Sequence, residues 1–392
     1  MTLHNKGFKC LLAEHSGHKM EGNVFVIGSG TSEGVPIVSC LTSPDASKCP
    51  TCQDTRTNQF SKNRRRNTCV AIHFTVPKDQ YLQCKLSHIQ NHSEETQTNE
   101  KSSIDTFVSK SLINDTTMPI TILVDAGKFF YQSCIELFPR LGLRNIDAVL
   151  ITHDHFDAIG GLDDLRDWTQ NISPGIALPL FSTERDYATM SKGFSYLTHP
   201  QSSTGGGGIP RIDFFPTLKP FLPIDIYGVQ IIPLPVFHGT TYISLGFRFG
   251  DVVYISDCSR IPFSTTEFII GKDALESENF DENLCKSDFP SVDWTDEMID
   301  IRKRALSTVT RCRTLVVDCL SPHENVHPSH FNLPHTIEYL KSLPEPKPEH
   351  IYFTGMCHKI NYEQHSLELE QYRSCNLNIS LLYDGFSLPF TA

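Results

Sequence analysis

Long apolar runs are missing from this chain of 392 residues. No uninterrupted stretch approaches the roughly 18–20 apolar residues that a membrane-spanning helix requires, which excludes a transmembrane protein. The first part of the sequence also lacks the apolar core of a secretory signal peptide and the arginine-rich, acid-free composition of most organelle transit peptides. We therefore expect a cytoplasmic protein that does not bind membranes.

An excess of positive charge is absent as well. The sequence holds 34 Lys and Arg against 45 Asp and Glu, a formal net charge of −11 with neutral histidines. A chain with this balance has no global attraction for polyphosphate, so stable nucleic-acid binding is not expected. Nothing repeats at a solenoid period, which favours a globular domain.

Metal-ligating side chains, in contrast, are plentiful. The chain has 13 Cys and 17 His. Because the cysteines are odd in number and spread over a long chain, metal ligation explains some of them better than a disulfide framework does. Together with the acids they supply the sulfur, nitrogen and oxygen ligands that metal sites need.

Short apolar runs alternate with helical patterns along the chain. Buried strands are expected at residues 24–27, 70–76, 120–124, 148–151, 229–234, 244–249, 252–255, 314–317 and 350–354. Helices are expected at about 129–141, 161–169, 296–310 and 333–343. Strands mixed with intervening helices indicate a layered α/β or α+β fold. We expect one domain over residues 23–385, with loop insertions at 78–118, 200–222 and 271–295, where the sequence is polar, acidic or rich in Gly and Pro.

The sharpest local pattern is ITHDHFDA at residues 151–158, directly after an apolar run. His153 and His155 are two residues apart on an extended turn and can point their imidazoles at one ion, while Asp157 can add an oxygen ligand. An isolated pattern of this kind is more often a solvated polar turn. The interpretation therefore depends on further ligands elsewhere in the chain.

Two later apolar runs end in such ligands. The segment LPVF at 234–237 stops at His238 beside a glycine, and the run at 252–255 is followed by Asp257. Taken singly, each is more often a turn or capping residue. Combined with His153 and His155, they form a set of three nitrogens and one oxygen that suits zinc and leaves a position open for hydroxide.

In that order, the HxHxD turn, the lone histidine and the strand-end aspartate resemble the metallo-β-lactamase superfamily. The sequence is most similar to its phosphoribosyl 1,2-cyclic phosphate phosphodiesterase branch. Four segments carry this resemblance, together with the cysteines near residues 40–52: GSGTSEGVP at 28–36, RRRN at 64–67, DAG at 125–127 and GLDDLR at 161–166. The likeness spans about residues 24–358. It implies an α+β fold, the αβ/βα four-layer sandwich, and a metal-dependent hydrolase in which a metal-bound hydroxide attacks a small or cyclic phosphodiester.

Two positions depart from the pattern of that superfamily. A histidine is expected where Ala158 stands, and the last metal histidine is expected near residues 353–358, where the alignment places Gly355. One lost ion would explain both changes. We therefore expect a single catalytic metal on His153, His155, His238 and Asp257, with Asp157 as a weak ligand or a group that orients water. A shifted register that brings His358 into this site is the alternative.

A separate metal site is expected at Cys40 and the CxxC pair Cys49 and Cys52, which can supply three thiolates to a tetrahedral ion. The resemblance adds His358 as the fourth ligand of a structural zinc. Free reduced thiols are the alternative interpretation. The cofactors expected are thus one catalytic and one structural Zn²⁺, with Mn²⁺ or Fe²⁺ as alternatives at the catalytic position.

Further groups are expected to meet a small phosphorylated substrate. His330 opens a helical pattern, and the resemblance favours it as the proton donor to the leaving oxygen. Arg66, Arg166 and Arg260 are the cations expected at the phosphate, although each is equally suited to a structural ion pair. The alternatives to a phosphodiesterase are a hydrolase of the same fold that acts on a thioester, a lactone or an RNA end, and a non-catalytic zinc-stabilised scaffold.

Overall fold

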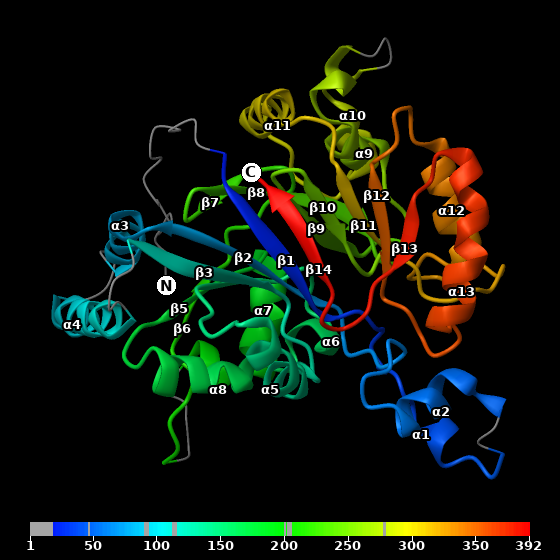
Figure 1. Ribbon diagram of the computed structural model, residues 1–392. Coiled ribbons are helices and arrows are strands. Elements are labelled where there is room, and N and C mark those ends of the chain that lie inside the picture. The colour runs from blue at the N-terminus through cyan, green and yellow to red at the C-terminus, as the bar shows by residue number, and fades with distance from the viewer. Residues whose placement is uncertain are drawn as a thin grey trace.

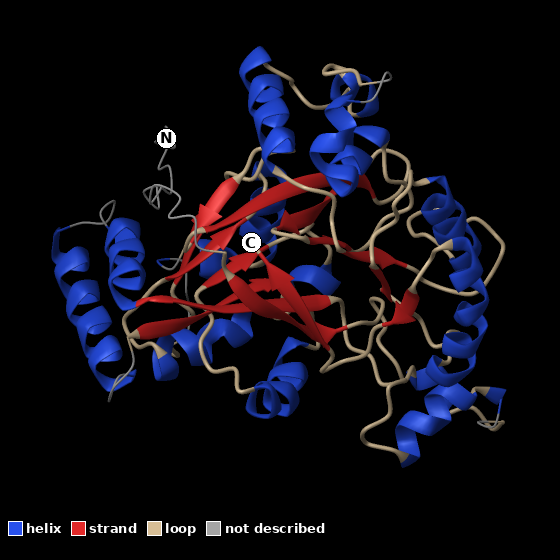
Figure 2. Ribbon diagram, turned by 45° about the horizontal axis from the view of Figure 1, so that its top comes forward, coloured by secondary structure: helices blue, strands red, loops and turns tan. Residues whose placement is uncertain are grey.

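The computed structural model describes residues 19–45, 48–89, 94–111, 116–199, 201, 206–276 and 280–392. Two seven-stranded sheets pack face to face and helices cover their outer faces (Figures 1 and 2). This arrangement confirms the expected α+β four-layer sandwich. None of the described helices is long and apolar enough to cross a membrane.

The first sheet is built mainly from the N-terminal half of the chain. Its order is β14 (Ser387–Thr391), β1 (Glu21–Gly28), β2 (Cys69–Pro77), β3 (Thr117–Val124), β4 (Ala148–Leu150), β5 (Leu178–Phe181) and β6 (Ile212–Phe215). Strands β14 to β3 pair antiparallel, whereas β3 to β6 pair parallel. The C-terminal strand β14 thus lies beside the first strand β1 (Figure 1).

The second sheet comes from the C-terminal half. Its order is β13 (Ile379–Leu381), β12 (His350–Thr354), β11 (Thr314–Asp318), β10 (Val252–Ile255), β9 (Ile243–Phe249), β8 (Val229–Phe237) and β7 (Ile224–Ile226). Strands β10 to β13 are parallel and β7 to β10 are antiparallel. Because parallel strands end at the same edge of a sheet, the residues that follow β10, β11 and β12 are brought together there.

Alternation along the strands explains the layers. Val252 and Tyr254 of β10 point into the core between the sheets, whereas Val253 and Ile255 face the outer helices. Strand β2 alternates in the same way, with Ile72 in the central core and Ala71 under the outer helices. Both faces of each sheet are therefore buried, which is why these strands read as continuous apolar runs.

The helices are α1 (Val38–Leu41), α2 (Pro50–Thr57), α3 (Lys78–Ile89), α4 (Glu94–Ser111), α5 (Phe130–Leu141), α6 (Phe156–Ile159), α7 (Glu184–Gly193), α8 (Ser195–Thr198), α9 (Phe263–Ile270), α10 (Leu284–Asp288), α11 (Asp296–Thr308), α12 (Leu333–Ser342) and α13 (Tyr362–Leu369). Helices α5 to α8 cover the first sheet, and α9 to α13 cover the second. Local sequence sets several starts: the Thr295 hydroxyl accepts from the Met298 N–H at the start of α11, and Asn361 caps α13 likewise. Short 3₁₀ turns occupy Leu162–Leu165, Gly271–Glu276 and Glu370–Cys375, and a π-helical turn occupies Trp168–Ile172.

The segment expected as one helix at 161–169 is instead a 3₁₀ turn followed by the π-helical turn. Both parts are tied to neighbouring elements. The Gly161 N–H donates to the carbonyl of Ala126 at 2.8 Å, and the Trp168 indole donates to the carbonyl of Arg144 at 2.8 Å. These hydrogen bonds to neighbouring elements take the place of the regular backbone hydrogen bonds of a surface helix.

The segments expected as insertions contain regular structure. Residues 78–118 hold α3 and α4, which stand beside the sandwich (Figure 1), and Ile104, Phe107 and Val108 are spaced so that α4 buries one apolar face. Residues 200–222 hold the edge strand β6, and 271–295 hold α10. Parts of all three segments, at 90–93, 112–115, 200, 202–205 and 277–279, lie outside the described residues. The division into a core and insertions stays a prediction.

Candidate metal centre

Three histidines from two strand ends meet at the edge of the sandwich. One ligand atom from each of His153, His155 and His238 lies within 4.8 Å of the others. His153 and His155 follow β4, and His238 follows β8 of the other sheet. A second such group joins His238 to Asp257 and His330. The structure therefore places the four predicted catalytic ligands and His330 around one place.

A hydrogen bond on the side that faces away from the site holds the ring of His153 in one orientation. Its Nδ1 lies 2.8 Å from the Thr152 hydroxyl, which donates its own proton to the buried carboxylate of Asp125 at 2.7 Å. Nδ1 of His153 must then carry the proton toward Thr152. The Nε2 atom of this buried ring has no hydrogen-bond partner among the described residues, so its lone pair is available to a metal.

His238 is oriented in the same manner. Its Nδ1 donates to the backbone carbonyl of Ser329 at 2.8 Å, which leaves Nε2 as the acceptor. That Nε2 lies 3.1 Å from Nδ1 of His155, the most exposed of the three histidines. The two nitrogens thus face the same point from different sheets.

Asp257 contributes a buried carboxylate. Its backbone is in the left-handed region at φ 48, a conformation that aspartate tolerates and that aims the side chain from the end of β10. The Thr68 hydroxyl donates to Oδ2 at 3.1 Å. Burial alone would raise the pKa of Asp257, but His153, His330 and His238 outweigh burial and lower that pKa.

The protonation states fit a cation at this place. Burial lowers the pKa of His153 to about 3 and that of His238 to about 4, so both imidazoles are neutral near pH 7. Metal ligation requires neutral imidazoles and an ionised carboxylate. The donor set of three nitrogens and one carboxylate, with an unpartnered buried Nε2 among them, suits Zn²⁺ and related divalent ions.

The predicted proton donor His330 lies beside this group. Its Nδ1 donates to Oδ2 of Asp318 at 2.8 Å, and its ring centroid is 4.8 Å from that of His238. Burial acts to lower the pKa of His330, but the buried Asp318 carboxylate outweighs this and raises it to about 9. Burial raises the pKa of Asp318 to about 6. Near neutral pH the proton therefore resides on His330.

Three positions bear on a second ion. Ala158 is buried and offers no ligand atom. At Gly355, where φ is 72, a Cβ atom would overlap Oδ1 of Asp318, so the aspartate carboxylate fills the space that a side chain would need. Burial and the negative charge of Asp257 raise the pKa of Asp157. Beyond the predicted ligands, His330 is the one described His or Cys that shares a candidate group with these residues.

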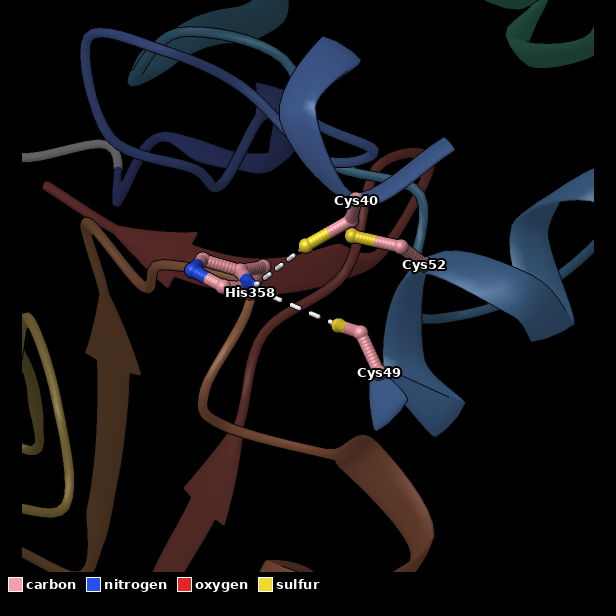
Figure 3. A group of neighbouring side chains, drawn as sticks. All are labelled: Cys40, Cys49, Cys52 and His358. Carbon is pink, nitrogen blue, oxygen red and sulfur yellow. Dashed lines mark hydrogen bonds between the residues drawn. The ribbon is translucent and has the colours of Figure 1, made fainter. Parts of the chain in front are cut away.

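The predicted thiolate site is also assembled. One ligand atom from each of Cys40, Cys49, Cys52 and His358 lies within 4.8 Å of the others (Figure 3). Nδ1 of His358 is 3.5 Å from the sulfur of Cys40 and 3.3 Å from that of Cys49. Burial raises the pKa of Cys52 to about 12, and the adjoining Cys49 adds to this. Burial also raises the pKa of Cys40, so Cys40 and Cys52 stay protonated without an ion, and a cation is the group that would hold them as thiolates.

The three predicted substrate arginines have different surroundings. Arg66 forms ion pairs with Glu136 and Asp384, and Arg166 pairs with Asp163 at 2.7 Å in a pocket of about 760 Å³ between α5 and the 162–172 segment. Neither forms a hydrogen bond or ion pair with the candidate ligands in the described structure. Arg260 is exposed, its carbonyl accepts from the Phe237 N–H beside His238, and its guanidinium lies 3.9 Å over the Phe237 ring.

Sequence reasoning missed Asp318, Thr152 and Tyr242. Asp318 ends the apolar run of β11, the same signal that identified Asp257. Thr152 precedes the first ligand, but nothing in its type separates it from other strand-end threonines. Tyr242 contacts His155 only because a loop folds back, so no local pattern could have indicated it.

The fold is shared with known proteins. Residues 121–277 match the family model of the beta-lactamase superfamily domain. Among solved structures, the chain is similar to a diphosphatase from the PhnP family, with a TM-score of 0.60 and 22% identity over 95% of this chain and 99% of that one. It is also similar to zinc-bound PqqB from Methylobacterium extorquens, with a TM-score of 0.55 and 13% identity over 93% and 99% of the two chains. At these identities the two structures establish the fold.

One curated relative matches over a shorter stretch. An octanoyltransferase of Porphyromonas gingivalis is 29% identical over 152 residues, which is 37% of this chain and 29% of that protein. The chain therefore spans less than a third of the length of this relative.

Proposed function

Since the chain has the metallo-β-lactamase fold and carries a beta-lactamase superfamily domain over residues 121–277, we propose that it is a metal-dependent phosphodiesterase acting on a small or cyclic phosphodiester. The observation that carries the proposal is the convergence of three histidines and Asp257, with His330 beside them. The similarity to a diphosphatase supports a phosphate ester or anhydride as the substrate class. A scaffold has little need of such an open ligand set.

We assign His153, His155, His238 and Asp257 as the ligands of one divalent ion, with zinc as the first candidate. An ion held there would supply Lewis-acid charge and lower the pKa of a water molecule. The absence of a ligand atom at Ala158 and Gly355 supports a single catalytic ion. Cys40, Cys49, Cys52 and His358 would hold a second, structural zinc.

The protein groups have separate tasks. The carboxylate of Asp157, next to Asp257, would orient the attacking water. His330 would donate its Nε2 proton to the leaving oxygen, since its Nδ1 proton is held by Asp318. Its positive charge would also stabilise the phosphate oxygens as the transition state forms. Arg260 is the predicted arginine that remains available for the substrate, because Arg66 and Arg166 are engaged in ion pairs.

The proposal is tested with bis-p-nitrophenyl phosphate, cyclic nucleotides, a thioester, a lactone and an RNA with a 3′ extension as substrates. Hydrolysis of the phosphodiesters that is lost in His153→Ala supports the proposal. Turnover of only the thioester or the lactone would assign another hydrolase of this fold. Absence of any turnover by metal-loaded protein would favour the scaffold.

A further inference from the structure

His155 lacks the support that the other two histidines have. His153 and His238 each have the ring nitrogen that faces away from the site bonded to a protein oxygen, at Thr152 and Ser329. Within the described residues, the one hydrogen-bond contact of the His155 ring is that of its Nδ1 with Nε2 of His238, and no protein group bonds its Nε2. A metal-ligating histidine is almost always oriented by such an outer partner, so a different group must hold this exposed ring.

The Tyr242 ring lies against that of His155. The two centroids are 5.0 Å apart and the planes are inclined by 19°, a stacked arrangement. Tyr242 also approaches the rings of His238 and His153, with centroids at 6.0 and 6.3 Å. No other aromatic ring in the described structure is stacked on His155.

Tyr242 is itself fixed to the two ligand segments. Its backbone carbonyl accepts from the N–H of His238 at 2.9 Å, so it closes the turn that follows β8. Its hydroxyl donates to the carboxylate of Asp154, the residue between His153 and His155, and accepts from the Asp154 N–H at 3.2 Å. The ring is thus anchored at its tip and at its backbone.

Two residues of α7 also help to hold the Tyr242 ring in place. The Thr189 hydroxyl donates to the other oxygen of Asp154 at 2.6 Å. The guanidinium of Arg185 lies 4.1 Å over the Tyr242 ring and pairs with the buried Asp186. These contacts leave the Tyr242 ring little freedom to turn.

We propose that Tyr242 is a positioning residue that holds the imidazole of His155 in the orientation in which Nδ1 binds the metal. The stack supplies for His155 what the hydrogen bonds of Nδ1 supply for His153 and His238. The inference rests on the proposed metal centre and assigns to it a residue outside the ligand set.

The test compares Tyr242→Leu, which removes the ring, with Tyr242→Phe, which keeps the ring and removes the hydroxyl. Tyr187→Leu is the matched control, because Tyr187 is also half-buried, packs on Phe214 and touches no candidate ligand. Each protein is titrated with Co²⁺ while its visible absorption is followed. The separate charge-transfer band of cobalt bound to thiolate reports the cysteine site.

We expect Tyr242→Leu to weaken Co²⁺ binding at the histidine site about 10- to 100-fold and to change its absorption, the usual effect of losing an outer partner. The Co²⁺ affinity of Tyr242→Phe should stay within a few fold of that of the unmodified protein. Tyr187→Leu should bind Co²⁺ with the same affinity as the unmodified protein. Unchanged affinity and spectrum in Tyr242→Leu would overturn the proposal, as would an equal loss in the control. If Tyr242→Leu does not fold, Tyr242→Met replaces it and is judged by the same two outcomes.

The unmodified protein separates this inference from the proposed function. If the unmodified protein has no Co²⁺ site that disappears in His153→Ala, the proposed metal centre is wrong. If it does bind such an ion and Tyr242→Leu binds it equally well, only the role of Tyr242 is wrong.

Discussion

Nδ1 of His330 lies 2.8 Å from Oδ2 of Asp318, a fully buried carboxylate at the end of β11. The two residues come from different ends of a long connection between β11 and α12, and the pair stands beside the candidate metal ligands. Oδ1 of the same aspartate has no hydrogen-bond partner among the described residues and occupies the space above Gly355. One carboxylate therefore both orients His330 and excludes a side chain at position 355.

Replacing Asp318 should change how activity depends on pH. The carboxylate raises the pKa of His330 from 6.5 to about 9 against the effect of burial, so the protonated form persists until the pH rises through about 9. In Asp318→Asn the largest of the influences that raise this pKa is gone, burial is opposed only by the weaker effects of Asp257 and Asp157, and the pKa of His330 falls. We expect the alkaline limb of kcat/KM to move to lower pH and activity at pH 8 to fall about tenfold or more, as profiles from pH 5 to 10 would show. An unmoved alkaline limb would remove His330 as the proton donor.

Removing a ligand should remove one ion. We expect about two ions per chain in the unmodified protein, measured by elemental analysis, and about one in His153→Ala, with phosphodiester hydrolysis reduced more than about 100-fold. The fold should survive, because His153 lies at a strand end rather than inside a core cluster.

His335→Ala on α12, outside all three candidate metal groups, is the control and should keep both ions. Three ions falling to one would show a binuclear site with ligands beyond those assigned.

Substituting Gly355 should cost more stability than its backbone conformation explains. Gly355 and Gly142 have similar φ values of 72 and 69, but an added Cβ meets Asp318 at Gly355 and nothing within 4 Å at Gly142. Gly142→Ala should lower the free energy of unfolding by about 1–2 kcal/mol, because alanine is strained in the left-handed conformation. Gly355→Ala should lower the free energy of unfolding, measured in urea, by about 1–3 kcal/mol more than Gly142→Ala does, because its Cβ also meets Asp318. Equal losses would mean that Asp318 moves aside freely.

The thiolate site should contribute to stability only through its ion. Cys49→Ser removes one of four ligands, and a metal that binds only the folded chain adds about 2.7 kcal/mol when free metal is 100 times its Kd. In zinc-containing buffer, we expect Cys49→Ser to have a free energy of unfolding lower by at least about 2.7 kcal/mol. With a chelator present, the difference from the unmodified protein should become small.

The exposed Cys375 offers the control, since Cys375→Ser should be neutral in both buffers. Full stability and unchanged zinc content in Cys49→Ser would contradict a structural ion.

Much of the fold and of the candidate site could be predicted from the sequence because its signals are local. Strands β2, β8, β10 and β11 are buried on both faces and read as apolar runs, and His238 and Asp257 were found because such runs end at them. The spacing of His153 and His155 and the CxxC pair are likewise properties of a few adjacent residues. Edge strand β6 was missed because its residues are only partly buried and lie in a Gly- and Pro-rich segment.

The tertiary structure alone decided which partners these residues have. It paired His330 with Asp318, placed Tyr242 on His155 and put the Asp318 carboxylate where Gly355 leaves room. It also engaged Arg66 and Arg166 in ion pairs that the sequence allowed but did not indicate. The physical reason is that a hydrogen bond, a ring stack or an ion pair depends on distances of a few ångströms between separate elements. Those distances follow from how the two sheets pack and where their loops return, which no pattern within one segment encodes.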